Sequence, residues 1–126
     1  MNRCIIGVGS NIDAEENIRR ALEILGNDFP VLGISEMIKT EPIGIKNQAE
    51  FTNGAVKIET TLQEDELLHY LKKLEDQLGR DRSLPKFGPR TIDLDIVIWN
   101  DQVVDSDYYE RDFLRKSCAE LGFKIR

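Results

Sequence analysis

The sequence is poor in residues that ligate metals through sulfur or nitrogen, and it has no long apolar run. Its two cysteines, Cys4 and Cys118, lie far apart without the spacing of a metal site, and we interpret both as reduced thiols of a cytoplasmic protein. The single histidine, His69, has no partner with which to bind zinc, and its place among leucines favours a partly buried or surface position over catalysis. The apolar run Ile5–Val8 is far too short for a membrane span, and no signal peptide is visible, so we expect no membrane partner.

Positive charge and phosphate-binding glycine motifs are also in short supply. With 17 Lys and Arg against 23 Asp and Glu, the net charge is −6, which disfavours nucleic acid as a partner and requires any polyphosphate site to gather its arginines locally. Neither G-x-x-x-x-G-K-[ST] nor G-x-G-x-x-G occurs, so the common nucleotide-binding scaffolds are excluded by motif. The composition that remains, 40% apolar and 32% charged, is ordinary for a globular protein, and we expect one domain over residues 1–126 with a modest core.

The apolar periodicity predicts alternating strands and helices. We expect strands at 3–9, 31–39, 51–60 and 91–99, helices at 13–27 and 61–78, a short return strand at 102–104, and a helical tail from 109 to about 120. Asp13 with Glu16 and Thr61 with Glu64 are the expected helix caps, and the glycines at 26 and 79 are the expected stops. The order is that of a ferredoxin-like β-α-β-β-α-β fold, an α+β fold with both helices packed on one face of an antiparallel sheet.

The most informative stretch is residues 88–99, GPRTIDLDIVIW, which places two acids in a strongly apolar strand. Because a strand alternates its faces with a period of two, Asp93 and Asp95 share one face, roughly 6–7 Å apart along the strand. An apolar strand does not normally accept two like charges side by side, and a divalent metal with oxygen ligands is the usual counterion. Four cations precede the acids: Arg80, Arg82, Lys86 and Arg90. Acids and cations at a strand entrance point to a site that holds metal and phosphate together.

Other interpretations of these charges stay open. The acids could belong to the polar face of an exposed edge strand, and the cations to a solvated ion-pair network. A triphosphate clamp is favoured because the basic loop directly precedes the acid strand. Elsewhere, Phe51 and Asn53 share a strand face, and an aromatic plate beside an amide suits a flat heterocycle. The turn Gly9-Ser10-Asn11 could face a ligand, although such a turn needs no function.

Several of these residues together carry a family resemblance. The run GPRTIDLDI closely resembles the signature of the 6-hydroxymethyl-7,8-dihydropterin pyrophosphokinases, enzymes of folate biosynthesis. The likeness continues through Gly9-Ser10-Asn11, residues 40–44, Gln48, Phe51-Thr52-Asn53, Glu59-Thr60, Leu67-Leu68, Glu75 and Gly79-Arg80. The family fold is ferredoxin-like, which agrees with the predicted order of elements.

The resemblance implies an ATP-dependent transfer of pyrophosphate to the hydroxymethyl oxygen of the pterin, with release of AMP. Asp93 and Asp95 would then bind two Mg²⁺ ions that bridge the ATP phosphates, while Arg80 and Arg90 neutralise charge that develops on the transferred group. The implied ATP site comprises Leu68, Lys72, Glu75, Arg82, Lys86, Ile96 and Arg111. The implied pterin site comprises Thr40, Glu41, Ile43, Phe51, Asn53, Phe87 and Phe113.

After Val104 the chain departs from the family pattern. The segment 105–109 replaces a longer connection that carries a histidine and basic ATP contacts, and 115–118 replaces an apolar stretch. Family members also run on beyond the position of Arg126, while Lys86 and Phe87 stand in place of an arginine and a tryptophan. Two other hypotheses follow: a catalytically impaired pterin- or nucleotide-binding protein of the same fold, and an interaction module without a ligand. We expect ATP and hydroxymethyldihydropterin as partners of a monomer, with a dimer as the alternative.

Overall fold

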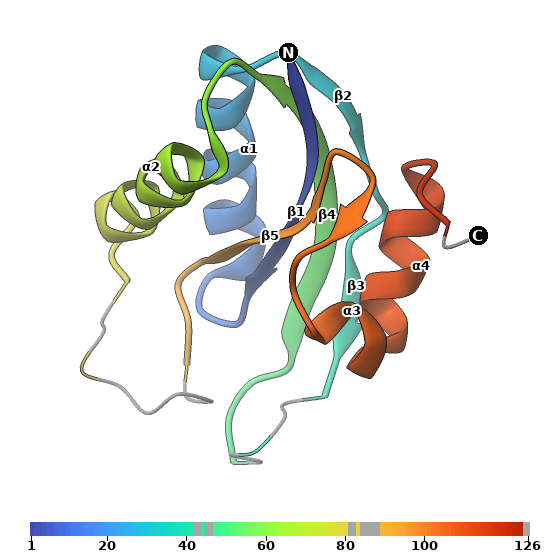
Figure 1. Cartoon of the computed structure of the whole chain (residues 1–126). Coiled ribbons are helices and arrows are strands. Elements are labelled where there is room, and N and C mark those ends of the chain that lie inside the picture. Colours follow the sequence, from blue (N-terminus) through green and yellow to red (C-terminus); the bar gives the residue numbers. More distant parts are fainter. Residues whose placement is uncertain (42–43, 45–46, 81–82, 84–88, 125–126) are drawn as a thin grey trace.

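A six-stranded antiparallel sheet forms the centre of the computed structural model, which describes residues 1–41, 44, 47–80, 83 and 89–124 (Figure 1). The elements in chain order are β1 (Asn2–Ser10), α1 (Ala14–Asp28), β2 (Val31–Ile34), β3 (Ile38–Thr40), β4 (Phe51–Thr60), α2 (Glu64–Gln77), β5 (Asp93–Trp99), β6 (Gln102–Val103), α3 (Asp107–Glu110) and α4 (Asp112–Glu120). The strands run in the order β2-β4-β1-β5-β6, with β3 pairing with β4. Every pairing among the described residues is antiparallel. The predicted class, helices with an open antiparallel sheet, is confirmed.

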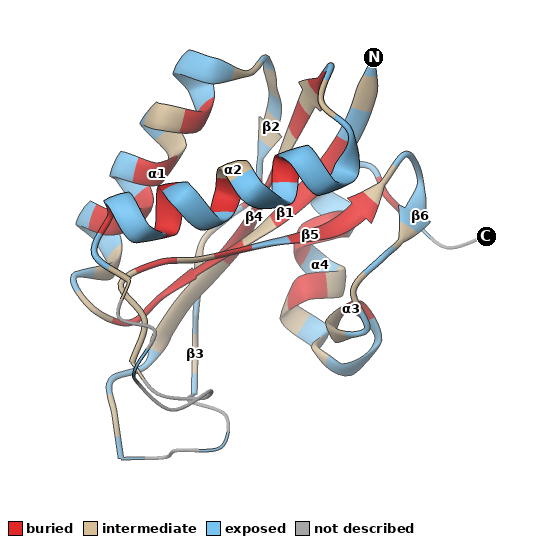
Figure 2. Ribbon diagram, turned by 60° about the vertical axis from the view of Figure 1, so that its left-hand side comes forward, coloured by how far each residue is buried: buried red, intermediate tan, exposed pale blue. Residues whose placement is uncertain are grey.

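The two faces of the sheet bury two separate apolar cores, because neighbouring residues of a strand point to opposite sides. On one face, Ile6 of β1 packs in a core with Leu25 of α1 and Leu71 of α2. On the other face, Ile5 of β1 packs in a core with Leu114 of α4. Figure 1 shows α1 and α2 on one side of the sheet and α3 and α4 on the other, and Figure 2 shows buried residues along α1 and α2. The tail helices therefore cover part of the face that the first two helices leave open.

The first helix begins and ends differently from its predicted signals. Asp13 precedes α1 with a left-handed backbone (φ 44°) and makes no side-chain capping bond. The expected stop at Gly26 lies inside the helix, which runs to Asp28. Leu25 is fully buried, and its carbonyl accepts a hydrogen bond from the Phe29 N–H (2.8 Å). Core packing thus carries the helix past a residue of low helix propensity.

The second helix keeps its predicted leucine face but uses a different capping pair. The leucines at 67, 71, 74 and 78 are all buried. Instead of Thr61 and Glu64, the N-terminus is closed by Gln63, whose backbone N–H donates to the Glu66 carboxylate (2.9 Å). At the other end Gly79 has φ 92°, a left-handed conformation that glycine adopts without strain, and the predicted stop is confirmed.

The predicted strand at 31–39 is split into β2 and β3. Ser35 interrupts it, because its hydroxyl accepts a hydrogen bond from the Ala55 N–H (2.8 Å) and so replaces a backbone carbonyl of the ladder. Met37 then lies against Gly54, where an added Cβ would overlap the Met37 sulfur. The alternation of apolar and polar residues alone predicts a continuous strand. It carries no information about a buried serine that competes with backbone groups for hydrogen bonds.

Strand β4 has the predicted bounds, whereas β5 is shorter than predicted. It begins at Asp93, because the carbonyl of Thr91 accepts a hydrogen bond from the Ser10 hydroxyl (2.6 Å) instead of joining the ladder. The predicted turn after β5 is confirmed, with positive φ at Asn100 and Asp101 (47° and 67°), residue types that tolerate this conformation. The return strand β6 ends at 103 rather than 104.

The tail is helical as predicted, but it forms two helices instead of one. α3 starts at Asp107, before the predicted 109, and α4 follows Arg111, whose backbone is extended (φ −118°, ψ 109°). The Arg115 guanidinium donates to the carbonyl of Tyr108 (3.0 Å), so a side chain of α4 closes the end of α3. Among the described residues, no helix combines the length and the apolar content that a membrane span needs.

Replacement of Ile5 by alanine is expected to lower the free energy of unfolding by about 2–5 kcal/mol. The reason is that Ile5 is 2% exposed and belongs to the core between the sheet and α4. The matched control is Ile34→Ala on β2, where the side chain is 52% exposed and the expected loss is below about 1 kcal/mol. Urea unfolding followed by circular dichroism measures both, and equal losses would contradict a second core.

Candidate functional site

Three adjacent strands carry the site residues in two rows across one face of the sheet. In the first row, Gly9 of β1 pairs with Asn53 of β4 and with Asp93 of β5. In the second row, two residues back along β1, Gly7 pairs with Asp95. Because the side-chain period is two, both rows point to the face that carries α4. The register thus brings a predicted pterin residue beside both predicted metal ligands.

The floor between these residues is bare backbone, because no side chain rises from Gly7 or Gly9. A Cβ on Gly9 would lie 2.7 Å from Asn53 Oδ1, and a Cβ on Gly7 would lie 3.2 Å from Val97 Cγ2. Any larger residue at Gly9 would push the Asn53 amide out of place. The two glycines therefore keep a hollow open between Asn53 and the acids.

A pocket of about 390 Å³ lies above these rows. Of the predicted site residues it brings together Thr40, Glu41, Phe51, Asn53, Arg80, Arg90, Asp93, Asp95, Arg111 and Phe113. The predicted residues Ile43, Arg82, Lys86 and Phe87 lie outside the described residues. One aromatic side chain lines the pocket from β4 and another from α4, an arrangement that suits a flat ring.

A second hollow, about 840 Å³ in volume, lies between α2 and β5 and is lined by Leu68 and Ile96, two of the predicted ATP residues. Asp95 and Asp105 line both hollows, so the two meet at these carboxylates. Lys72, another predicted ATP residue, is exposed on α2 and lines neither of these hollows. One of the two acids of the predicted metal pair therefore stands where two bound molecules would meet.

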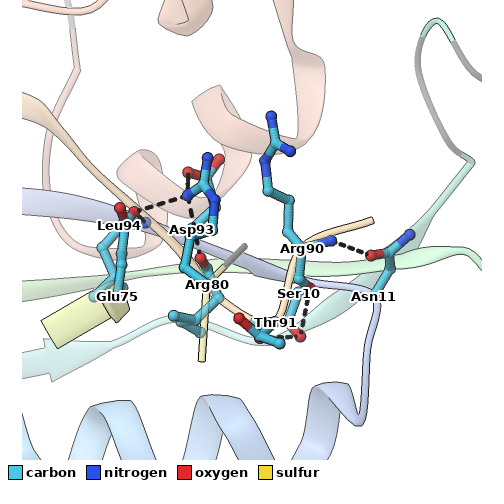
Figure 3. A network of polar contacts seen from close by, with 9 residues as sticks. Ser10, Asn11, Glu75, Arg80, Arg90, Thr91, Asp93 and Leu94 are labelled. Carbon is cyan, nitrogen blue, oxygen red and sulfur yellow. Dashed lines mark hydrogen bonds and ion pairs between the residues drawn. The ribbon is translucent and has the colours of Figure 1, made fainter. Parts of the chain in front are cut away.

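Figure 3 shows how Arg80 is held beside the acids. Its Nη1 lies 3.3 Å from Glu75 Oε2 and 3.2 Å from Asp93 Oδ1. Glu75 is 3% exposed, and its Oε2 also accepts a hydrogen bond from the Leu94 N–H (2.8 Å). Among the described residues, β5 pairs with β6 only in its last two residues. Glu75 therefore supplies the Leu94 N–H with the acceptor that a neighbouring strand would otherwise give. The observed role of Glu75 is to orient Arg80, and its contact with ATP stays a prediction.

Two guanidinium groups converge on the acids. The pKa of Arg90 is lowered, first by partial burial and then by the like charge of Arg80, while Asp93 and Asp95 act in the opposite direction. The Nε–H of Arg80 is buried and has no hydrogen-bond partner among the described residues. A buried donor without a partner is costly. An oxygen of an anionic ligand would satisfy it.

The negative charge of the acid pair is only partly compensated by neighbouring cations. The pKa of Asp95 is raised to about 8, chiefly because surrounding protein withdraws the carboxyl from water, and further because Asp93 and Asp105 carry like charge. Asp95 remains accessible from the open side of the pocket, while protein atoms crowd its other sides. The carboxyl groups of Asp93 and Asp95 share one face of β5, so each disfavours the charged form of its neighbour.

A divalent cation fits the donor set of this pair. Carboxylate oxygens are the hard ligands that Mg²⁺ prefers, and a cation between the two acids would offset their mutual repulsion. No cluster of three metal-ligating side chains gathers in the described part of the chain. Water or phosphate oxygens would therefore complete the coordination, as is usual for Mg²⁺.

Sequence reasoning missed the acids at the rim of the pocket. Asp105 and Asp107 line it from the segment 105–109, in which the basic ATP contacts implied by the family resemblance are missing. Asp105 Oδ1 accepts a hydrogen bond from the Asp107 N–H (2.9 Å), and burial raises the pKa of Asp105. Their spacing carries no signal, because only the reversal of the chain at β6 brings Asp105 back beside Asp95.

The sequence leaves open whether the turn Gly9-Ser10-Asn11 faces a ligand, and of these three residues only Gly9 lines the pocket. Ser10 and Asn11 line neither hollow and contact the backbone around Arg90 instead (Figure 3). The signal for this was available in part, since short polar side chains in a turn commonly bond to backbone groups. Which backbone segment they reach depends on the sheet register.

Comparison with known proteins gives consistent matches over most of the chain. The model of the family described as 7,8-dihydro-6-hydroxymethylpterin-pyrophosphokinase (HPPK) matches residues 5–122. The 2-amino-4-hydroxy-6-hydroxymethyldihydropteridine pyrophosphokinase of Bacillus subtilis is 37% identical, over 95% of this chain and 78% of that protein. The protein of the same name from Haemophilus influenzae is 31% identical, over 93% of this chain and 79% of its own length. The folic acid synthesis protein fol1 of Schizosaccharomyces pombe is 41% identical over 93% of this chain, which spans 17% of that longer protein.

The raised pKa of Asp95 predicts a pH dependence of stability in the absence of divalent ions. A folded carboxyl that titrates near 8 holds its proton more tightly than the unfolded one, whose ordinary value is 3.8. Its contribution to stability is therefore lost as the pH rises through this window. Thermal melting should show Asp95→Asn becoming more stable relative to the wild type as the pH is raised from about 4 to about 8.

The matched control is Asp101→Asn, an exposed turn residue at positive φ, where asparagine is well tolerated. This variant should follow the wild type at every pH. A constant difference in melting temperature between Asp95→Asn and the wild type across the window would contradict the raised pKa.

Proposed function

Because the chain belongs to the 7,8-dihydro-6-hydroxymethylpterin-pyrophosphokinase family, we propose that it transfers pyrophosphate from ATP to the hydroxymethyl oxygen of 6-hydroxymethyl-7,8-dihydropterin and releases AMP, a step of folate biosynthesis. One observation carries this function at the level of the site. The pairing of Gly9 with Asn53 and Asp93 sets an amide suited to a heterocycle beside an acid suited to a metal-bound polyphosphate. No observation favours the catalytically impaired alternative.

The proposal extends to the fold and its assembly. The strand order β2-β4-β1-β5 supports a ferredoxin-like fold, with β2 and β3 together in the place of the second strand. A single domain over residues 1–126 and a monomer are proposed as well. In their support, elements from separate parts of one chain line each hollow.

Asp93 and Asp95 are proposed to hold two Mg²⁺ ions between the hollows. Magnesium bound there supplies charge neutralisation for the polyphosphate. The carboxyl pair presents hard oxygen ligands, and Asp95 borders the hollow lined by Leu68 and Ile96, where the nucleoside part of ATP is proposed to bind. The phosphates would then lie toward the acids.

Arg80 and Arg90 are proposed to neutralise charge that develops on the transferred group. Such a transfer depends on positioning and electrostatics more than on a nucleophilic side chain. Arg80 suits this task because Glu75 and Asp93 fix its position, while its Nε–H has no partner among the described residues. Arg90 and Arg111 line the same pocket from other segments.

Asn53 is proposed to bond with the amide edge of the pterin, with Phe51 and Phe113 on either face of the ring. Its Nδ2 donates to Thr40 Oγ1 (2.5 Å), which fixes the rotation of the amide. Thr40 and Glu41 line the same pocket and are proposed to offer backbone groups, or for Thr40 its hydroxyl, to the ring. An amide already held in one orientation binds a ring edge at a lower entropic cost.

A direct assay tests the proposed activity. The protein is incubated with ATP, Mg²⁺ and 6-hydroxymethyl-7,8-dihydropterin, and AMP release is followed by a coupled reaction. Titration calorimetry with a non-hydrolysable ATP analogue and Mg²⁺ measures binding separately. AMP release that requires the pterin supports the proposal, whereas binding of both ligands without AMP release would support the impaired alternative.

Asp95→Ala is expected to lower turnover by more than about a hundredfold, because the polyphosphate loses a ligand of its counterions. Pterin affinity should change little, since Asn53 and the aromatic residues are untouched. AMP release measures the first quantity and pterin titration the second, with Asp101→Asn as the matched control. Turnover close to that of the wild type would refute the metal role.

Arg90→Ala is expected to lower kcat by about a hundredfold, because charge on the transferred group is less well neutralised. Its effect on pterin affinity should be much smaller. The matched control is Arg20→Ala, which removes an exposed arginine of α1. Steady-state kinetics and pterin titration measure the two effects, and equal losses in both would identify Arg90 as a structural residue.

A further inference from the structure

One buried side-chain amide, that of Asn11, holds two segments that border the pocket. Asn11 is 9% exposed, follows β1 directly and lines neither hollow. Its side chain forms hydrogen bonds with Gln48 and Arg90, which lie 37 and 79 positions later in the chain. It is therefore placed to act on the site without contacting a substrate.

The first set of contacts fixes the backbone of Arg90. The Arg90 N–H donates to Asn11 Oδ1 (2.7 Å), and the Arg90 carbonyl accepts from the N–H groups of Asn11 (3.0 Å) and Ile12 (3.3 Å). The hydroxyl of Ser10 donates to the neighbouring carbonyl of Thr91 (2.6 Å). Figure 3 shows the Arg90 side chain extending away from this turn, and Arg90 lines the pocket. The turn thus sets the point from which the guanidinium reaches the site.

The second set of contacts holds the segment just before β4. Asn11 Nδ2 donates to Gln48 Oε1 (2.9 Å) and to the Ala49 carbonyl (3.0 Å). Asn53 follows on β4 and lines the pocket. With the Arg90 N–H on its oxygen and two acceptors on its nitrogen, both ends of the Asn11 amide are engaged.

We propose that Asn11 is a positioning residue, which aligns Arg90 with the pterin side of the pocket through a single side chain. This inference rests on the proposed function of the pocket. Misplacement of a reacting group by about 1 Å can cost about a hundredfold in rate. A fixed link between the two segments therefore acts on kcat through Arg90 and on pterin binding through the segment at 48–49.

The chain offers a matched control in Asn17. This residue is 7% exposed, and its Nδ2 donates to the carbonyl of Ile12 (2.7 Å), so it supports the same turn from α1. Among the described residues, its side chain forms no hydrogen bond with Arg90 or Gln48. Loss of Asn17 tests what general loosening of the turn does, without removal of either link.

The test is a double-mutant cycle that measures kcat and the pterin KM. In the wild-type background, Asn11→Ala should lower kcat by about ten- to a hundredfold and raise the pterin KM. In the Arg90→Ala background it should lower kcat by less than about threefold, because the effect passes through Arg90. The pterin KM should still rise there, because that link does not involve Arg90.

Equal loss of kcat from Asn11→Ala in the two backgrounds would overturn the proposal. The same coupled pattern for Asn17→Ala would overturn it as well, since that variant breaks neither link. If Asn11→Ala does not fold, Asn11→Asp replaces it and keeps an oxygen acceptor for the Arg90 N–H. That variant should raise the pterin KM and retain kcat, and a kcat loss as large as that of Arg90→Ala would refute the role.

Binding measurements separate this proposal from the proposed function. The four proteins of the cycle are titrated with a non-hydrolysable ATP analogue and Mg²⁺, and Asn11→Ala should weaken binding only where Arg90 is present. Absence of pterin-dependent AMP release by the wild type would refute the proposed function. Equal weakening of analogue binding with and without Arg90 would refute the role of Asn11 alone.

Discussion

The register of β1 between β4 and β5 is the constraint on which the site depends. It sets Asn53, Gly9 and Asp93 in one row. A slip by one residue would turn a whole strand over and would bury carboxylates in the core beneath α1 and α2, at a high cost in free energy. The apolar side chains that resist such a slip, Ile6 and Val8, lie on the opposite face. Packing on one side of the sheet therefore fixes geometry on the other.

The balance of charge in the pocket follows from this geometry. Arg80 lies between Glu75 and Asp93, whereas burial and the like charge of Asp93 raise the pKa of Asp95. The site thus holds both signs of charge at close range. A free polyphosphate would be repelled by the acids, whereas a divalent cation between the acids offsets their charge. A polyphosphate that carries its metal ions satisfies both sets of groups, which is consistent with the proposed co-substrate.

Sequence periodicity predicted the features that depend on neighbours along the chain. The bounds of β4, the leucine face of α2 and the helix stop at Gly79 are of this kind, and all three are confirmed. The shared face of Asp93 and Asp95 is another. Each follows from the spacing of residues within one element, which the sequence displays directly.

Features that depend on partners far away in the chain were missed. Ser35 splits a strand because Ala55 donates to its hydroxyl, and Asp105 joins the acids only after the chain reverses. In the sequence, Asn11 has the features of an ordinary turn residue, and only the folded sheet brings Arg90 and Gln48 to it. Neither residue type nor spacing identifies such partners, since the same side chains satisfy local backbone groups in most turns.

Helix α4 joins the second core to the pocket through two neighbouring residues. Leu114 is buried in this core close to Gly7, Phe113 packs against the core, and both residues line the pocket. A ring seated against Phe113 contacts a helix whose attachment depends on the next residue in the chain. By the reciprocity of linked equilibria, whatever strengthens one attachment strengthens the other. In the proposed complex, substrate and tail helix thus act as mutual ligands of one sheet face, and each raises the free energy needed to remove the other.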